Sequence, residues 1–111
     1  APLPVGLDLE TIRPVSDALM TKVADDDEWR LGGGQEKKLF FRFWTAKEAV
    51  LKAVGKGIAG LSRCRIMEIV DDTHMTMTYD GTPWPVEHFW FDGHVAALTP
   101  HHFTVAWTFH Q

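Results

Sequence analysis

The sequence has a single cysteine, Cys64, among its 111 residues. An internal disulfide is therefore impossible, and a zinc site built from several cysteines is excluded. The sequence shows no signal-peptide pattern and no apolar run long enough to span a membrane. It has no excess of basic residues, because its formal net charge is -4. A general nucleic-acid-binding protein needs a basic surface for the phosphate backbone. We therefore expect a cytoplasmic protein without nucleic-acid or membrane partners.

The composition that remains is typical of a folded domain. Hydrophobic residues make up 45% and charged residues 23% of the chain, both ordinary for globular proteins. Five tryptophans and seven phenylalanines favour a well-packed core or a buried interface. The length fits one modest core, and no repeat, low-complexity tract or linker is evident. We predict one domain over residues 1–111.

The first quarter of the chain predicts a strand followed by a helix. Residues 2–10 alternate between apolar and other side chains, which indicates a strand with Asp8 and Glu10 on the same face. Pro14 marks the start of the next element, where the apolar residues are spaced as in a helix. This helix is expected to end near the acidic run at residues 25–28.

The middle of the chain predicts the main helix, and the remainder predicts short strands. Residues 31–35, LGGGQ, form a loop; the helix then covers about residues 36–54 and ends at Gly55. Further strands are expected at residues 65–72, 74–80, 88–92, 94–99 and 103–109, with Asp-Gly turns between some of them. The predicted architecture is α+β, with the long helix and a shorter helix packed on an antiparallel sheet.

A group of acids and lysines on the first strand and the long helix suggests a metal and phosphate site. If the helix packs beside the strand, Glu48 converges with Asp8 and Glu10, and carboxylate oxygens are ligands that suit Mg²⁺. Lys52 lies one helical turn after Glu48 and could neutralise a phosphate. The glycines at 55 and 57 would let the backbone approach that phosphate, with Lys56 adding charge.

Simpler explanations exist for each of these residues. Glu48 and Lys52 have the spacing of an ordinary helix salt bridge, which stabilises by a few tenths of a kcal/mol. Acids near the end of a strand are usually solvated, and Gly55 is most often a helix cap. Four histidines, His94, His101, His102 and His110, lie late in the chain. They lack partners at a recognised metal-site spacing, and we do not expect a metal site there.

Two motifs in combination resemble those of the 4′-phosphopantetheinyl transferase superfamily. VGLDLE, at residues 5–10, resembles the family's first motif, which contains a metal-binding aspartate. FWTAKEAVLKAVGKGI, at residues 43–58, is similar to its second motif, W-[ST]-x-K-E-A-x-x-K-x-x-G-x-G. Every fixed position of that pattern is met, and the interval between the motifs also fits. The resemblance covers the first half of the chain in detail and implies the fold of that family.

The resemblance implies an enzyme that moves the phosphopantetheine arm of coenzyme A to a serine of an apo acyl or peptidyl carrier protein. Adenosine 3′,5′-bisphosphate would be released. Asp8, Glu10 and Glu48 would hold Mg²⁺, or alternatively Mn²⁺, against the coenzyme A pyrophosphate. Lys52 would bind the phosphate and offset its charge, Lys47 would be a second phosphate contact, and Glu48 would accept the serine proton.

The resemblance also implies partners. Arg13 follows the first motif, in a region that contacts the acidic carrier protein in the family; an exposed arginine is the simpler reading. The carrier would serve fatty acid, polyketide or peptide synthesis.

The family has a short type that forms trimers and a long type made of two similar halves. This chain has the length of the short type, whereas DLE and the Trp44-Thr45 pair resemble the second half of the long type. We therefore expect a homo-oligomer, with a trimer favoured, or pairing with another half-domain. The aromatic segment from Trp84 to Trp107 could supply the interface. The alternative function is a non-catalytic domain that binds coenzyme A or the carrier, or one half of a larger transferase or synthase.

Overall fold

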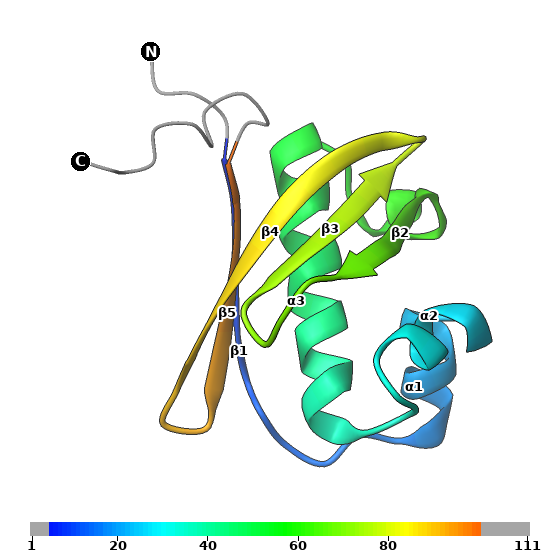
Figure 1. The fold of residues 1–111 in the computed structure, drawn as a ribbon, viewed down its shortest axis with the longest axis vertical. Coiled ribbons are helices and arrows are strands. Elements are labelled where there is room, and N and C mark those ends of the chain that lie inside the picture. The colour runs from blue at the N-terminus through cyan, green and yellow to red at the C-terminus, as the bar shows by residue number, and fades with distance from the viewer. Residues whose placement is uncertain (1–4, 101–111) are drawn as a thin grey trace.

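The computed structural model describes residues 5–100, which form one antiparallel sheet and a set of helices packed on it (Figure 1). The helices are α1 (Asp17–Val23), α2 (Asp26–Leu31), α3 (Lys37–Val54) and the 3-10 helix η1 (Ile58–Arg63). The strands are β1 (Val5–Thr11), β2 (Cys64–Ile69), β3 (His74–Tyr79), β4 (Thr82–Phe91) and β5 (His94–Pro100). The predicted α+β architecture is confirmed.

The sheet has the strand order β1-β5-β4-β3-β2, and every neighbouring pair is antiparallel. The last four strands follow one another through short connections, and β1 then pairs with β5. Asp80-Gly81 and Asp92-Gly93 form two of the turns with positive φ angles, 50° and 85° in the first and 44° and 73° in the second. Asp and Gly tolerate this left-handed conformation better than other residues, which is why these pairs signal a hairpin.

The structure corrects the predicted elements at two places. The first helix does end beside the acidic run, at Val23, but this run also starts a second helix that was not predicted: the Asp25 side chain accepts from Glu28 N and the Glu28 side chain accepts from Asp25 N. This reciprocal capping box satisfies amides at the helix start. Strand β4 begins at Thr82, earlier than predicted, because its two prolines are accommodated in the strand. The strand predicted at residues 103–109 lies outside the described residues.

Helix α3 lies across one face of the sheet, and α1 and α2 lie together beside its first half (Figure 1). Its buried side chains include Phe41, Phe43, Val50 and Leu51, which contribute to one core with residues from the strands. Burial of this apolar stripe holds the helix on the sheet. None of the helices in the described part of the chain is long and apolar enough to cross a membrane.

The other face of the sheet carries exposed apolar side chains. Leu7 and Leu9 of β1 and Phe89 and Phe91 of β4 are each roughly half exposed. Strand register places Leu9 opposite Ala96, and Ala96 opposite Phe89, so these side chains share one face. No element from residues 5–100 covers this face. We call the group of Leu7, Leu9, Phe89 and Phe91 the open apolar face.

Candidate functional site

The site is built where β1 lies against the second half of α3. Gly6 permits this close approach, because a Cβ atom at that position would lie 1.6 Å from the backbone oxygen of Ala49. Alternation along the strand then turns Asp8 toward the helix and its flanking leucines outward. The chain therefore buries an aspartate and exposes two leucines, the reverse of the usual pattern for a strand that covers a core.

Asp8 is a buried carboxylate that is only half satisfied. Its Oδ1 accepts a hydrogen bond from Lys52 Nζ at 3.0 Å. Its Oδ2 is buried and makes no hydrogen bond with any described residue. Burial raises the pKa of Asp8 above its ordinary value, although the nearby Lys52 ammonium acts to lower it. A buried carboxylate oxygen without a partner is rare in a folded protein, because desolvation is not repaid there.

Glu48 lies one turn before Lys52 on α3 and is partly buried. Burial raises the pKa of Glu48, and the negative charges of Asp8 and Glu10 raise it further, while Lys52 opposes them. Asp8 and Glu10 therefore lie close enough to Glu48 for their charges to affect its pKa. Within residues 5–100, however, no three His, Cys, Asp or Glu side chains meet closely enough to enclose a metal ion as they stand. The helix salt bridge that spacing suggested for Glu48 is also not formed, because Lys52 pairs with Asp8 across to β1.

The other strand acid also has a basic partner. Arg13 Nη1 lies 3.4 Å from Glu10 Oε1, and it donates to the backbone oxygen of Thr11 at 2.8 Å. The Arg13 guanidinium also lies 4.9 Å from the centroid of the Phe41 ring. Both acids of β1 therefore have a cation beside them, from α3 in one case and from the segment after β1 in the other.

Lys47 lies in a different environment from Lys52. Its Nζ is 3.0 Å from Glu28 Oε2 and donates to the backbone oxygen of Val23 at 2.7 Å, and both charged side chains are almost fully buried. Glu28 Oε2 also accepts from Ile66 N at 2.8 Å. The Lys47 ammonium therefore ties α3 to α1 and α2, and Glu28 extends this link to β2. A phosphate contact from Lys47, as the resemblance implied, would require this buried pair to break.

The glycine loop after α3 serves first as a helix end. Gly55 has a left-handed φ of 77° and its N–H bonds to the last turn, as does the N–H of Lys56. These amides are thus used in the cap. Gly57 is the N-cap residue before η1, and the Lys56 side chain is exposed. Any phosphate contact from this loop would therefore rest on the Lys56 side chain and on Gly57.

The sequence did not single out three buried polar residues, which are Glu28, Arg42 and His88. Glu28 carried one signal, since Asp25 and Glu28 have the spacing of a capping box. His88 Nε2 lies 3.0 Å from the backbone oxygen of Arg42, while burial lowers the pKa of His88 to about 4. Its neutral ring supports the sheet beneath α3. His94 lies in β5, and the other three late histidines lie outside the described residues.

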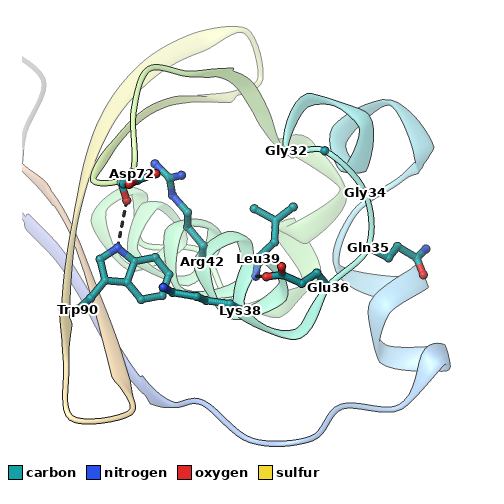
Figure 2. Close-up of a pocket in the computed structure, with 10 residues that line it drawn as sticks. Gly32, Gly34, Gln35, Glu36, Lys38, Leu39, Arg42, Asp72 and Trp90 are labelled. Atoms are coloured by element: carbon teal, nitrogen blue, oxygen red, sulfur yellow. Dashed lines mark hydrogen bonds between the residues drawn. The ribbon is translucent and has the colours of Figure 1, made fainter.

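A polar hollow lies near the start of α3 (Figure 2), and none of Asp8, Glu10 and Glu48 is among the residues that line it. Its volume is about 720 Å³, and its wall includes the loop at residues 32–34, Arg42, Asp72 and Trp90. Lys38 Nζ lies 4.7 Å from the centroid of the Trp90 ring, whose Nε1 donates to Asp72 O at 3.0 Å. The surrounding charges are of both signs, and Arg42 donates to backbone oxygens of the β2–β3 turn. These contacts join α3 to the sheet and indicate no particular ligand.

Comparison with known proteins places the chain in a family. The family model of the 4′-phosphopantetheinyl transferase superfamily matches residues 4–106. The chain belongs to that superfamily. It is 44% identical to the 4′-phosphopantetheinyl transferase HetI of Nostoc sp. over 68 residues, which are 56% of this chain and 29% of that protein. It is 38% identical to the 4′-phosphopantetheinyl transferase psf-1 of Bacillus pumilus over 64 residues, 53% of this chain and 28% of that protein. The matches therefore span less than a third of each relative's length.

Proposed function

We propose that this chain carries the metal-binding and phosphate-neutralising part of a phosphopantetheinyl transferase site. The donor would be coenzyme A and the acceptor a serine of an apo acyl or peptidyl carrier protein. The observation that carries the proposal is Asp8, a buried carboxylate with one unpaired oxygen, which lies beside Lys52 and is electrostatically coupled to Glu48. Superfamily membership supports the same reaction.

The residues present fit a divalent metal ion. The unpaired Oδ2 of Asp8 and the carboxylates of Glu10 and Glu48 are hard oxygen ligands on facing elements. As they stand these carboxylates do not enclose an ion, so metal binding would have to draw them together. When bound, Mg²⁺ would supply charge neutralisation and a template for the pyrophosphate, and Mn²⁺ could replace it. Asp8, Glu10 and Glu48 would hold it.

In the proposed reaction the side chains of this chain would accept a proton, neutralise phosphate charge and hold α3 in place. The serine oxygen attacks the phosphorus that bears the pantetheine arm, the bond from that phosphorus to the leaving adenosine 3′,5′-bisphosphate breaks, and the serine proton passes to Glu48. Glu48 would be the proton acceptor, and burial raises the pKa of its carboxyl in the metal-free protein. Lys52 and Lys56 would neutralise charge on the phosphates, with Gly55 and Gly57 shaping the loop. Lys47 would hold α3 in place rather than contact the ligand.

We propose the carrier protein docks beside Arg13. A hollow of about 260 Å³ lies there, mostly apolar and lined among others by Leu19, Phe40 and Trp44, with Arg13 and Lys22 at its wall. An acidic carrier would meet an apolar surface and two positive charges at this hollow.

A cytoplasmic setting fits this partner and the buried thiol of Cys64, whose pKa burial raises to about 12.

The open apolar face suggests that a second unit completes the site. Leu7 and Leu9 lie on the side of β1 opposite Asp8, and the relatives are several times longer than the matched stretches. We propose that another copy of this chain, in a trimer or a smaller oligomer, or another half-domain covers this face. Sedimentation of the chain with Leu9→Asp against the wild type tests this. A wild-type monomer that is fully active would contradict it.

The decisive experiment is transfer to a panel of apo carrier proteins. The chain is incubated with coenzyme A and Mg²⁺, and each carrier is weighed by intact mass spectrometry. We expect one added phosphopantetheine, lost with a chelator and lost with Glu48→Gln. Coenzyme A binding without transfer would instead favour a non-catalytic binding domain or one half of a larger enzyme. Normal turnover of Glu48→Gln would show that the base is assigned wrongly.

A further inference from the structure

Lys52 occupies the carboxylate that the proposed metal ion needs. Its Nζ lies 3.0 Å from Asp8 Oδ1 and 3.0 Å from the backbone oxygen of Leu7, so the ammonium is fixed against β1 by two contacts. The Asp8 side chain is 8% exposed, whereas the Lys52 side chain is 52% exposed. The aspartate is therefore fixed in the protein, and the lysine reaches it from the solvent side.

From this contact we infer that Lys52 is a built-in counter-cation that competes with the divalent metal for Asp8 and is released when the metal binds. The inference rests on the proposed function, because it assumes that Asp8 is a metal ligand. A divalent ion bound at Asp8 Oδ2 would lie only a few ångströms from the ammonium at Oδ1. At that separation, and beside a buried group, two cations repel strongly.

Release gives Lys52 a second task. Its long side chain is half exposed and lies in the last turn of α3, so it can leave Asp8 without disturbing the helix. Once free, the ammonium becomes available to a phosphate held beside the metal. The same lysine would therefore weaken metal binding in the absence of a diphosphate ligand and support diphosphate binding after the metal has entered. Linkage requires that the metal weaken the Lys52–Asp8 contact by the same factor as this contact weakens metal binding.

The packing of β1 against α3 explains why Lys52 pairs with Asp8 rather than with Glu48. Glu48 lies one turn before Lys52, yet Lys52 pairs across to β1. The close contact of Gly6 with Ala49 brings Asp8 within reach of the lysine. A Glu48–Lys52 pair would have left Asp8 buried with no counter-charge, which is the more costly arrangement.

The test is the affinity of Mn²⁺ for the 111-residue chain without coenzyme A, measured by titration calorimetry or electron paramagnetic resonance at mildly alkaline pH and low salt. We expect Lys52→Met to bind Mn²⁺ about tenfold more tightly than the wild type. Lys52→Arg keeps the charge and should bind as the wild type does. Lys37→Met removes an exposed lysine from the first turn of the same helix and should change nothing. Equal or weaker binding by Lys52→Met would overturn the inference.

Two further measurements separate the possible failures. In one outcome the wild type binds Mn²⁺, Glu48→Gln binds it more weakly, and Lys52→Met binds it with wild-type affinity. The proposed metal site then stands, and the competition by Lys52 is wrong. If no variant binds Mn²⁺, the metal site and the competition both fail. Should Lys52→Met not fold, NMR of dimethylated lysines in the wild type replaces it. Mg²⁺ should then shift the Lys52 signal and not that of Lys37, and an unmoved Lys52 signal would overturn the inference.

Discussion

Helix α3 carries two lysine–carboxylate pairs of equal length in unlike surroundings. Lys47 and Glu28 are 3.0 Å apart, as are Lys52 and Asp8. In the first pair both side chains are buried, and Glu28 also accepts from backbone amides at 2.8 Å and 3.1 Å. In the second pair the lysine is half exposed, and one oxygen of Asp8 has no hydrogen-bond partner among residues 5–100.

The difference separates a pair that serves the fold from one that is open to a ligand. Glu28 has used its acceptor capacity within the protein, so a newcomer would have to displace existing bonds. Asp8 has a buried oxygen that lost its water without gaining a hydrogen bond from a described residue. An incoming cation could bind this oxygen without displacing an existing bond. The completeness of hydrogen bonding, rather than the distance between charges, distinguishes the two pairs. Three predictions test this distinction.

The largest expected effect is on folding stability. Lys47→Met leaves the Glu28 carboxylate buried without its counter-charge, and we expect a loss of about 3–5 kcal/mol in the free energy of unfolding. Lys52→Met also removes the counter-charge of a buried carboxylate, but Lys52 approaches Asp8 from the exposed side, where water can partly replace it, so we expect a smaller loss of about 1–2 kcal/mol. Urea denaturation of both variants measures the gap. Equal losses would show that the two pairs do not differ as described.

A smaller effect is expected from Gly6→Ala. The added Cβ would meet the backbone of Ala49, which cannot rotate away, so β1 must shift from α3. We expect a loss of about 2–4 kcal/mol and weaker Mn²⁺ binding, because Asp8 moves with the strand. Gly57→Ala is the matched control for stability, since its Cβ would meet nothing within 4 Å. Unchanged Mn²⁺ affinity in Gly6→Ala would show that this close contact does not position Asp8.

The smallest expected effect comes from Asp8→Asn. Burial raises the pKa of Asp8, so the folded chain holds this proton more tightly than the unfolded chain does. Near neutral pH the aspartate is charged and its burial costs stability, so Asp8→Asn should match or exceed the wild type by up to about 1 kcal/mol. This advantage should shrink as the pH falls and the wild-type carboxyl becomes protonated.

Asp8→Asn should also lose Mn²⁺ binding. This variant would therefore change the free energy of unfolding little and the metal affinity strongly. Glu28→Gln is the matched change in the other pair and should instead destabilise the chain at neutral pH. Urea midpoints at neutral and mildly acidic pH provide the comparison. A marked destabilisation by Asp8→Asn at neutral pH would contradict the view that Asp8 is held for a ligand.

Much of the architecture followed from local patterns. The long helix was predicted at residues 36–54 and is found at Lys37–Val54, because its apolar spacing and Gly55 are local signals. The extra helix α2 was missed because an acidic run was read as an end, although Asp25 and Glu28 cap a start. Strand β4 is longer than the predicted segment at residues 88–92, because pairing with β3 accommodates Pro83 and Pro85 in the strand although prolines disfavour strands.

The sequence by itself determined the α+β class, the period-two strand with Asp8 and Glu10 on one face, and the motif that marks the superfamily. These features depend on residues within one turn or strand of each other. The tertiary structure alone decided that Lys47 pairs with Glu28 in the core and that Lys52 pairs with Asp8 on β1, because these partners lie 19 and 44 residues away. It also decided that β1 turns its acids inward and its leucines outward. Alternation defines two faces of a strand, but contact with a helix selects which face is buried.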